Sequence, residues 1–347
     1  MKRAFGRFYA ELNIFQEISL KLATLRDGTP DGKLVLVDTT RKTMCAVPEH
    51  AATLQQALDR WDAVAAPLSD VYRRLCANEV DGIQPLDFDE LVAPLPRSFQ
   101  WLDASAYLRH VELVRRARGA GMPPSALTDP IMYQGVSAPF LPWNGAIEVL
   151  GSNWGTDFEA ELVVVTGEIA AGASKAECAQ AIRLIGLAND ISLRGLIPEE
   201  LAKGFGFIHG KPPTALGPLF ITPDELGDQW DGERAHLELR VSHNGTTVGS
   251  LQTGEDMHFS FADLIHHATR TRPLCAGTVL GAGTVSNQRE GSGYGCIAER
   301  RAVEMIGGVT PLASFLVDGD IVRIEAFSNR GNSVFGCIEQ RVHHAAT

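Results

Sequence analysis

At 347 residues, the chain is long enough for a large and a small domain, each with a buried core. Its formal net charge of −11 at pH 7, without any run of Lys or Arg, would repel polyanions and excludes nucleic acid as a partner. No apolar stretch reaches the roughly 18 residues that a membrane span needs, so we expect no membrane partner and a cytoplasmic location.

The chain begins with a short segment, residues 1–18, whose apolar positions are interrupted by polar residues, so it does not resemble a secretory signal. We interpret it as an N-terminal extension. Residues 19–95 predict a small β-module with helices, because short β-type runs precede a helical pattern over 50–79. Pro67 predicts a break between two helices there. The prolines within 85–96 place a domain boundary near residue 95.

The remainder, residues 96–347, is rich in predicted strands and in glycine. An Asn-Gly dipeptide predicts a β-hairpin within 236–254, and 315–327 predicts a turn followed by a strand. Helical periodicity is present over 175–190 and 260–271. Regular alternation of strands and helices is lacking, which argues against a doubly wound or TIM-barrel fold. The chain therefore belongs to the α+β class and is mainly β.

Acidic residues alternate in the stretch GTDFEAELVVVTGE, residues 155–168. On a strand Asp157, Glu159 and Glu161 share one face, which becomes apolar further along. Buried carboxylates at such a position would repel one another unless a cation lies between them. The pattern therefore indicates either a divalent-cation site or a solvated acidic strand end.

Two further groups of polar residues stand in apolar surroundings. Asp103, Tyr107 and His110 would share one face if they were helical, although a surface helix would have the same pattern. Asp190 and Arg194 follow an apolar run with the character of a helix, and both are candidate site residues. The alternative interpretation is an intrahelical ion pair at the end of that helix.

Several loop motifs also deserve comparison with known sites. Lys211 and Thr284 each stand beside a glycine, and each taken alone is typical of a loop. The surroundings of Glu299 alone do not mark it as a site residue. The segment around Lys211 is not a phosphate-binding loop, since Pro212 stands where Ser or Thr is required. The glycines of 291–295 do not follow a clear strand, and the chain has no G-x-S-x-G elbow.

The six cysteines form neither a CxxC pair nor a Cys/His cluster with zinc-site spacing. We therefore expect buried thiols in a reducing compartment, without zinc and without disulfides. They are spread along the chain: Cys45, Cys76, Cys178, Cys275, Cys296 and Cys337.

The order of these motifs resembles the fumarylacetoacetate hydrolase family in its long form with an N-terminal domain. The resemblance extends from about Leu20 to Val342. It is carried by a series of short motifs: Asp103 with His110 seven residues later, Tyr133 in MYQG, Glu159-x-Glu161, NDISLR, GK, GAGTVS, GCIAE and FLVDGD.

The resemblance implies a mixed β-sandwich or β-roll catalytic domain of the fumarylacetoacetase type after an SH3-like β-module, and a homodimer. It places the metal ligands on four carboxylates: Asp103, Glu159, Glu161 and Asp190. These oxygen ligands favour Mg²⁺ or Ca²⁺, with Mn²⁺ as a substitute. It assigns six further roles: His110 as water-activating base, Glu299 as its orienting carboxylate, Lys211 and Arg194 as carbanion-stabilising cations, and Tyr133 and Thr284 as substrate contacts.

Some residues depart from the family pattern. Asp157 matches no family ligand and is left out of the expected site. Ser105 replaces an aromatic residue, and Ile197 replaces a glutamine, both expected near the far end of the substrate. The motif around Lys211 is one residue shorter than usual, so Lys203 offers a competing alignment, although the distance from Asp190 favours Lys211.

The expected activity is hydrolysis of a carbon–carbon bond in a 1,3-diketo acid, with fumarylacetoacetate, an intermediate of tyrosine and other aromatic degradation, as leading candidate. The alternatives are a fumarylpyruvate or acylpyruvate hydrolase, or an isomerase, hydratase or decarboxylase acting on a 2-keto or 2-hydroxydienoic acid. A non-catalytic metal-binding protein is the third interpretation. The pairing of His110 with Glu299 favours hydrolysis, because water activation requires a base.

Overall fold

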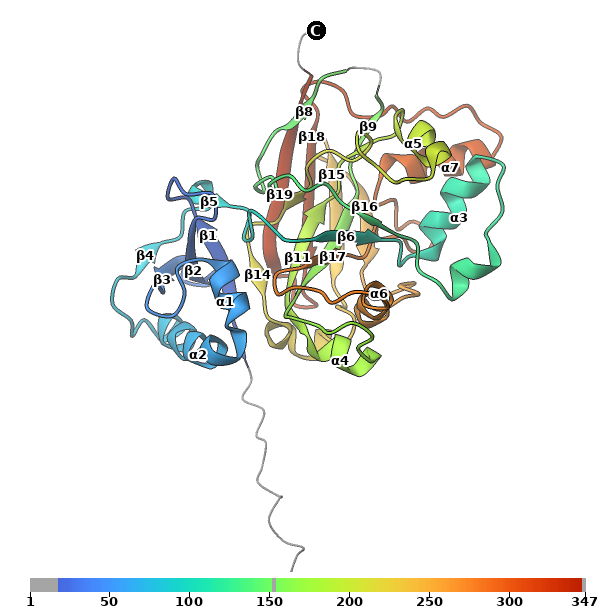
Figure 1. Cartoon of the computed structure of the whole chain (residues 1–347). Coiled ribbons are helices and arrows are strands. Elements are labelled where there is room, and N and C mark those ends of the chain that lie inside the picture. Colours follow the sequence, from blue (N-terminus) through green and yellow to red (C-terminus); the bar gives the residue numbers. More distant parts are fainter. Residues whose placement is uncertain (1–17, 152–153, 345–347) are drawn as a thin grey trace, which may run out of the picture.

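The computed structural model describes residues 18–151 and 154–344. The expected N-terminal extension therefore lies outside the described residues except for Ile18. The described chain combines β-sheets with peripheral helices, which confirms the α+β class (Figure 1). Within this part of the chain, none of the helices has the length and apolar character to cross a membrane.

Twelve strands form one large mixed sheet. They are β1 (Lys21–Leu25), β2 (Lys33–Asp38), β3 (Thr43–Ala46), β4 (Gln84–Pro85), β5 (Leu91–Val92), β6 (Trp101–Ala104), β7 (Met132–Gln134), β10 (Ala160–Thr166), β11 (Ile182–Asn189), β13 (Ala215–Leu216), β14 (Phe220–Ile221) and β17 (Val279–Gly281). Its order is β4-β3-β2-β1-β14-β11-β10-β17-β6-β7, with β13 paired to β11 and β5 to β1. All described pairings in this sheet are antiparallel except that of β17 with β6.

The other strands form a five-stranded and a two-stranded sheet. The larger has the order β16-β15-β18-β19-β8 and comprises β8 (Ile147–Val149), β15 (Glu238–His243), β16 (Thr246–Gln252), β18 (Ile321–Phe327) and β19 (Ser333–His344). The smaller pairs β9 (Thr156–Asp157) with β12 (Ser192–Leu193). The predicted hairpin is confirmed as β15–β16, and the strand predicted within 315–327 is β18.

The helices lie around the sheets. They are α1 (Leu54–Asp59), α2 (Trp61–Ala77), α3 (Leu108–Ala117), α4 (Lys175–Gln180), α5 (Ile197–Lys203), α6 (Phe261–Ala268) and α7 (Ile297–Ile306), with 3-10 turns η1 (Phe88–Glu90), η2 (Pro124–Leu127) and η3 (Pro223–Gln229). Figure 1 shows α1 and α2 at one side of the molecule and α3, α5 and α7 gathered at the other. The helix predicted within 260–271 is confirmed as α6.

Among the described residues, the N-terminal strands join the later strands through one strand pairing. β1 pairs with β14, placing Leu22 opposite Phe220, so the large sheet continues from the N-terminal part into the later strands. The domain boundary near residue 95 and the SH3-like character of this part remain predictions. The predicted break at Pro67 is wrong, because the helices separate at Arg60 and Pro67 lies inside α2. Buried residues on both sides of the proline, Leu68 among them, hold one helix across it.

Two other predicted helices are wrong in part. Only the first residues of 175–190 are helical, since α4 ends at Gln180 and β11 follows. β11 is buried along almost its whole length in the middle of the sheet, and a buried strand has the same continuous apolar run as a buried helix.

The segment with Asp103, Tyr107 and His110 is not one helix either. Asp103 lies in β6, Tyr107 precedes α3 as its N-cap, and His110 is in the first turn of α3. The Tyr107 hydroxyl is buried and donates to the Thr253 carbonyl at 2.6 Å. Tyr107 is therefore a packing residue, whereas the strand-to-helix turn directs Asp103 and His110 toward the region beside β10.

Candidate active site

Four buried carboxylates converge from three strands of the large sheet, of which β11 and β10 are neighbours and β6 is separated from β10 by β17. Asp103 comes from β6, Glu159 precedes β10, Glu161 lies in β10, and Asp190 follows β11. Each is at most 5% exposed, and one ligand oxygen from each lies within 4.8 Å of the others. We call this group the carboxylate cradle. The single strand expected for 155–168 is interrupted after Asp157, where β9 ends, but Glu159 and Glu161 do point to a common site.

Two glycines make room for the cradle. Gly281 is the neighbour of Asp103 in the parallel β17–β6 pairing, and a Cβ atom there would lie 2.6 Å from both Asp103 Oδ1 and Glu161 Oε2. Gly283, with a φ of +78°, donates its N–H to Glu161 Oε2 at 2.9 Å. The close approach of two carboxylates therefore requires glycine at 281, whereas the positive φ and the Ala104 carbonyl, with which a Cβ would clash, require it at 283.

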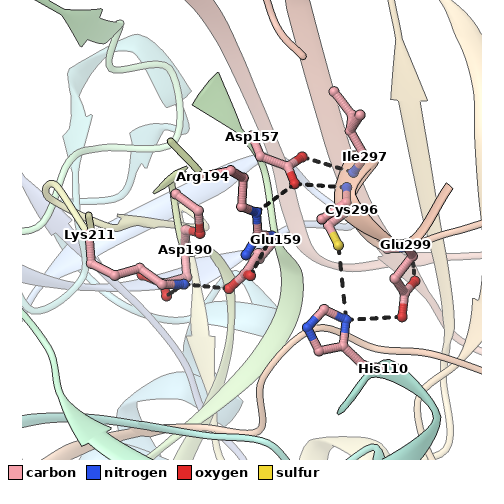
Figure 2. A network of polar contacts seen from close by, with 12 residues as sticks. His110, Asp157, Glu159, Asp190, Arg194, Lys211, Cys296, Ile297 and Glu299 are labelled. Atoms are coloured by element: carbon pink, nitrogen blue, oxygen red, sulfur yellow. Dashed lines mark hydrogen bonds and ion pairs between the residues drawn. The ribbon is translucent and has the colours of Figure 1, made fainter. Parts of the chain in front are cut away.

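Lys211 lies against one side of the cradle (Figure 2). Its ammonium donates to Glu159 Oε2 at 2.6 Å and to Asp190 Oδ2 at 2.5 Å. The Tyr133 hydroxyl also donates to Asp190 Oδ2, and the Lys211 nitrogen lies 5.4 Å from the centre of the Tyr133 ring. The backbone before Lys211 is fixed by Glu200, which accepts from the N–H groups of residues 208–210. Lys203, in contrast, is exposed at the end of α5.

Arg194 and Asp157 lie beside the cradle. The Arg194 guanidinium donates from Nε to Asp157 Oδ2 at 2.9 Å and from Nη2 to Glu159 Oε1 at 2.6 Å. Asp157 also accepts the first N–H groups of α7, from Ile297 and Ala298. The intrahelical pair of Asp190 with Arg194 that we considered as an alternative is therefore not formed. Asp157 connects Arg194 to the N-terminus of α7, although sequence reasoning left it out.

His110 and Glu299 form a second cluster, where α3 packs against α7. His110 Nδ1 lies 3.0 Å from Glu299 Oε1, and the other oxygen of Glu299 accepts the Gly295 N–H at 3.2 Å. Cys296, the N-cap residue of α7, has its Sγ 4.0 Å from the same Nδ1 atom, and Figure 2 shows Cys296 and Glu299 pointing toward the histidine. Burial, followed by the Asp157 and Glu299 carboxylates, raises the pKa of the Cys296 thiol well above its usual value.

The cations divide the cradle into two unlike halves. Burial would raise the pKa of Glu159, but Lys211 and Arg194 outweigh it and lower that pKa. Asp103 and Glu161 have no cation within hydrogen-bond distance among the described residues. Burial, and then the Asp190 charge, raises the pKa of Asp103 to about 8, and burial with the Asp103 charge raises the pKa of Glu161 well above its usual value.

The cradle fits a hard divalent cation. When ionised, its four carboxylates together with Asp157 exceed the charges of Lys211 and Arg194 by three. Glu161 Oε1 is buried without a hydrogen-bond partner in the described chain, so it is free to ligate. All four donors are oxygen atoms, the type that hard cations prefer. The group can therefore hold a divalent metal.

The remaining expected residues lie at the edges of this region. Thr284 is buried beside the glycine motif, and its hydroxyl has no hydrogen-bond partner in the described chain. Ser105 is half-buried after β6. Ile197 is buried and lies so close to Gly210 that a Cβ there would be 2.7 Å from its Cγ1 atom, so it packs behind the Lys211 loop.

Most of the chain matches described protein families. Residues 100–343 match the family model for the fumarylacetoacetate (FAA) hydrolase C-terminal region, and residues 20–97 match fumarylacetoacetase N-terminal domain 2. A curated relative, 2,4-didehydro-3-deoxy-L-rhamnonate hydrolase from Sphingomonas sp. (strain SKA58), is 27% identical over 214 residues, which cover 60% of this chain and 70% of the relative.

Solved structures share the fold. One is the fumarylacetoacetate hydrolase from Exiguobacterium antarcticum, with a TM-score of 0.62 and 15% identity over 94% of this chain and all of that one. Another is 2-hydroxyhepta-2,4-diene-1,7-dioate isomerase from Mycobacterium marinum, with a TM-score of 0.58 and 17% identity over 95% of this chain and all of that one. The fold is thus common to hydrolases and isomerases.

Proposed function

Because the chain belongs to the fumarylacetoacetate hydrolase family, we propose that it is a metal-dependent hydrolase that cleaves a carbon–carbon bond in a 1,3-diketo acid. Fumarylacetoacetate, giving fumarate and acetoacetate, is the leading substrate. The observation that carries the proposal is the contact of His110 with Glu299 beside the carboxylate cradle. The cationic side chains of Arg194 and Lys211 already contact that cradle. This arrangement combines a base for water with charges that stabilise an anionic leaving group.

His110 serves as the base. The Glu299 carboxylate accepts a hydrogen bond from Nδ1–H, which leaves Nε2 as the unprotonated nitrogen of the neutral ring. Nε2 takes a proton from water, the resulting hydroxide adds to a substrate carbonyl, and the bond to the carbon between the carbonyls breaks. The imidazolium then returns the proton to the carbanion carbon, so one water is consumed and the histidine is regenerated.

Lys211 and Arg194 stabilise the enolate that bond cleavage leaves. Each retains donors beyond those that contact carboxylates, since an ammonium has three donors and a guanidinium has five. The cradle of Asp103, Glu159, Glu161 and Asp190 would hold Mg²⁺ or Ca²⁺, with Mn²⁺ as a substitute. A divalent cation there supplies Lewis-acid polarisation of substrate oxygens. Preorganised charge of this kind acts where negative charge develops.

The chemistry of the enolate and the name of one curated relative support the proposed substrate class. A carbon flanked by two carbonyls is a good leaving group, because its negative charge is delocalised onto one carbonyl oxygen after cleavage. The curated Sphingomonas relative is named for a 2,4-didehydro acid, whose carbonyl carbons are also separated by one carbon. The buried Thr284 hydroxyl and the Tyr133 ring provide polar and aromatic contacts for such a compound.

The test is a substrate panel of fumarylacetoacetate, fumarylpyruvate, acylpyruvates, 2,4-didehydro-3-deoxy-L-rhamnonate and oxaloacetate. Products are followed by NMR with Mg²⁺ and after chelation. Lys211→Met should abolish turnover, whereas Lys203→Met should retain it, because only Lys211 contacts the cradle. Cleavage of one diketo acid into two carboxylic products, lost on chelation, is the expected result.

Other outcomes would overturn the proposal in distinguishable ways. A shift of a double bond, or release of CO₂ from oxaloacetate, without cleavage of any diketo acid would indicate the isomerase or decarboxylase alternative. Metal binding without turnover of any compound in the panel would indicate a non-catalytic protein.

A further inference from the structure

Three different metal-ligating groups meet next to the cradle. One ligand atom each from Cys296, His110 and Glu299 lies within 4.8 Å of the other two, although His110 is 186 residues from Cys296. Cys296 is the N-cap residue of α7, and Glu299 lies in the first turn of that helix. The cysteine and the glutamate are buried, whereas the His110 side chain is 14% exposed and offers an entry path.

The separations are close to those of a tetrahedral zinc centre, although they do not equal them. Zinc bonds of about 2.0–2.3 Å at a tetrahedral angle place neighbouring ligand atoms about 3.3–3.6 Å apart. In the structure His110 Nδ1 is 3.0 Å from the Glu299 oxygen and 4.0 Å from the Cys296 sulfur, so the distances lie on either side of this range. Side-chain shifts of a few tenths of an ångström would bring both distances into the range of a tetrahedral zinc centre.

We propose that Cys296, His110 and Glu299 form a second metal site, which takes borderline or soft cations such as Zn²⁺ or Cd²⁺ and thereby switches off the base. The site is distinct from the cradle in its donors. Sulfur and imidazole select zinc, whereas the four carboxylates of the cradle suit harder cations. A thiolate and a carboxylate also balance the double charge of the cation. Only the inhibitory consequence rests on the proposed function.

Inhibition follows from the histidine tautomer. A cation bound at Nδ1 replaces the hydrogen bond to Glu299, and the neutral ring then carries its proton on Nε2. The nitrogen that takes a proton from water would thus become a donor. Since the thiol must lose its proton to bind, zinc affinity should rise with pH and binding should release protons.

The experiment uses the full chain with saturating Mg²⁺, so that the cradle is occupied. Zn²⁺ binding is measured by calorimetry, and Cd²⁺ binding by the ultraviolet charge-transfer band of a cadmium thiolate. Cys296→Ser removes the sulfur ligand, and Cys178→Ser is the matched control, since both thiols are 0% exposed but Cys178 contacts Thr269 instead. His110→Ala is the second variant, in case Cys296→Ser does not fold.

We expect one Zn²⁺ per wild-type chain and a cadmium–thiolate band, both retained in Cys178→Ser. Cys296→Ser and His110→Ala should bind zinc more than about 10-fold more weakly, the smallest loss expected even for an outer-shell partner. In the active enzyme, additional Mg²⁺ should not relieve zinc inhibition. Equal zinc affinity and an equal band in wild type and Cys296→Ser would overturn the inference. The binding measurements need no substrate, so they test the site even if the proposed hydrolase activity fails.

Discussion

Glu159 and Glu161 lie two residues apart on the same chain segment. Their electrostatic environments nevertheless predict that removing the negative charge has opposite effects on the stability of the metal-free protein. Lys211 and Arg194 lower the pKa of Glu159 against the effect of burial, so its ionised form is favoured. Burial and Asp103 raise the pKa of Glu161, so its protonated form is favoured without metal. We therefore expect Glu159→Gln to destabilise the metal-free protein and Glu161→Gln to leave it as stable or to stabilise it.

The contributions of these two glutamates to folding stability also change with pH in opposite directions. Glu161 has a raised pKa in the folded state, so its contribution to stability is complete below the unfolded pKa and is lost as pH rises toward the folded pKa. The advantage of Glu161→Gln over wild type should therefore grow between pH 5 and pH 8. Glu159 has a lowered folded pKa, so its contribution is complete above the unfolded pKa and is lost only as pH falls through the folded one.

The changes in stability that we expect from these substitutions and from Mg²⁺ are large enough to measure by thermal unfolding. Breaking a buried ion pair costs about 3–5 kcal/mol. Unfolding entropy of about 2.1 cal/mol/K per residue gives ~0.7 kcal/mol/K for this chain, so Glu159→Gln should lower the Tm by roughly 4–7 °C. Mg²⁺ at 100 times its dissociation constant adds about 2.7 kcal/mol, or ~4 °C, to wild type. Both variants should lose most of that increase.

The assay is calorimetric or fluorescence-monitored unfolding of wild type and both variants at pH 5 and pH 8, after chelation and again with Mg²⁺. Equal destabilisation by the two substitutions at pH 8 without metal would refute the assignment of unlike halves to the cradle. If Mg²⁺ raised the Tm of Glu161→Gln as much as that of wild type, the role of Glu161 as a metal ligand would be refuted.

Three further predictions concern the neighbouring residues. His110→Ala should leave Mg²⁺ affinity unchanged and lower kcat by roughly 10²- to 10⁴-fold, and Glu299→Gln should cause a smaller loss; full cleavage by His110→Ala would contradict its role as base. Asp157→Asn should lower the free energy of unfolding by about 1–3 kcal/mol in urea titrations, because the hydrogen bonds to Arg194 and to α7 lose their charge. Since the pKa of Asp103 is about 8 without metal, Mg²⁺ affinity should rise from about pH 6 to about pH 8.5, with proton release detected by calorimetry in different buffers.

Features set by local periodicity could be predicted from the sequence. The alternation of acids in residues 155–168 placed Glu159 and Glu161 together, and the Asn-Gly turn predicted the β15–β16 hairpin. The same reasoning failed for β11, because a strand buried in the middle of a sheet loses its alternation and resembles a helix. It also failed for Asp103 and His110, since their spacing suits a helix but a strand-to-helix turn separates them.

Contacts between distant elements left no trace in the local pattern. Asp157 belongs to the same acidic stretch as Glu159, yet what makes it important is that Arg194 and the N-terminus of α7 meet at its carboxylate. Cys296 follows a glycine in an ordinary motif, and only the packing of α3 on α7 brings it to His110. Asp157 binds both the guanidinium that touches the cradle and the helix that carries Glu299. The carboxylate cradle and the helix that carries Glu299 are therefore linked through the Asp157 carboxylate, and we expect a change in the position of α7 to be transmitted to both the cradle and the His110–Glu299 pair.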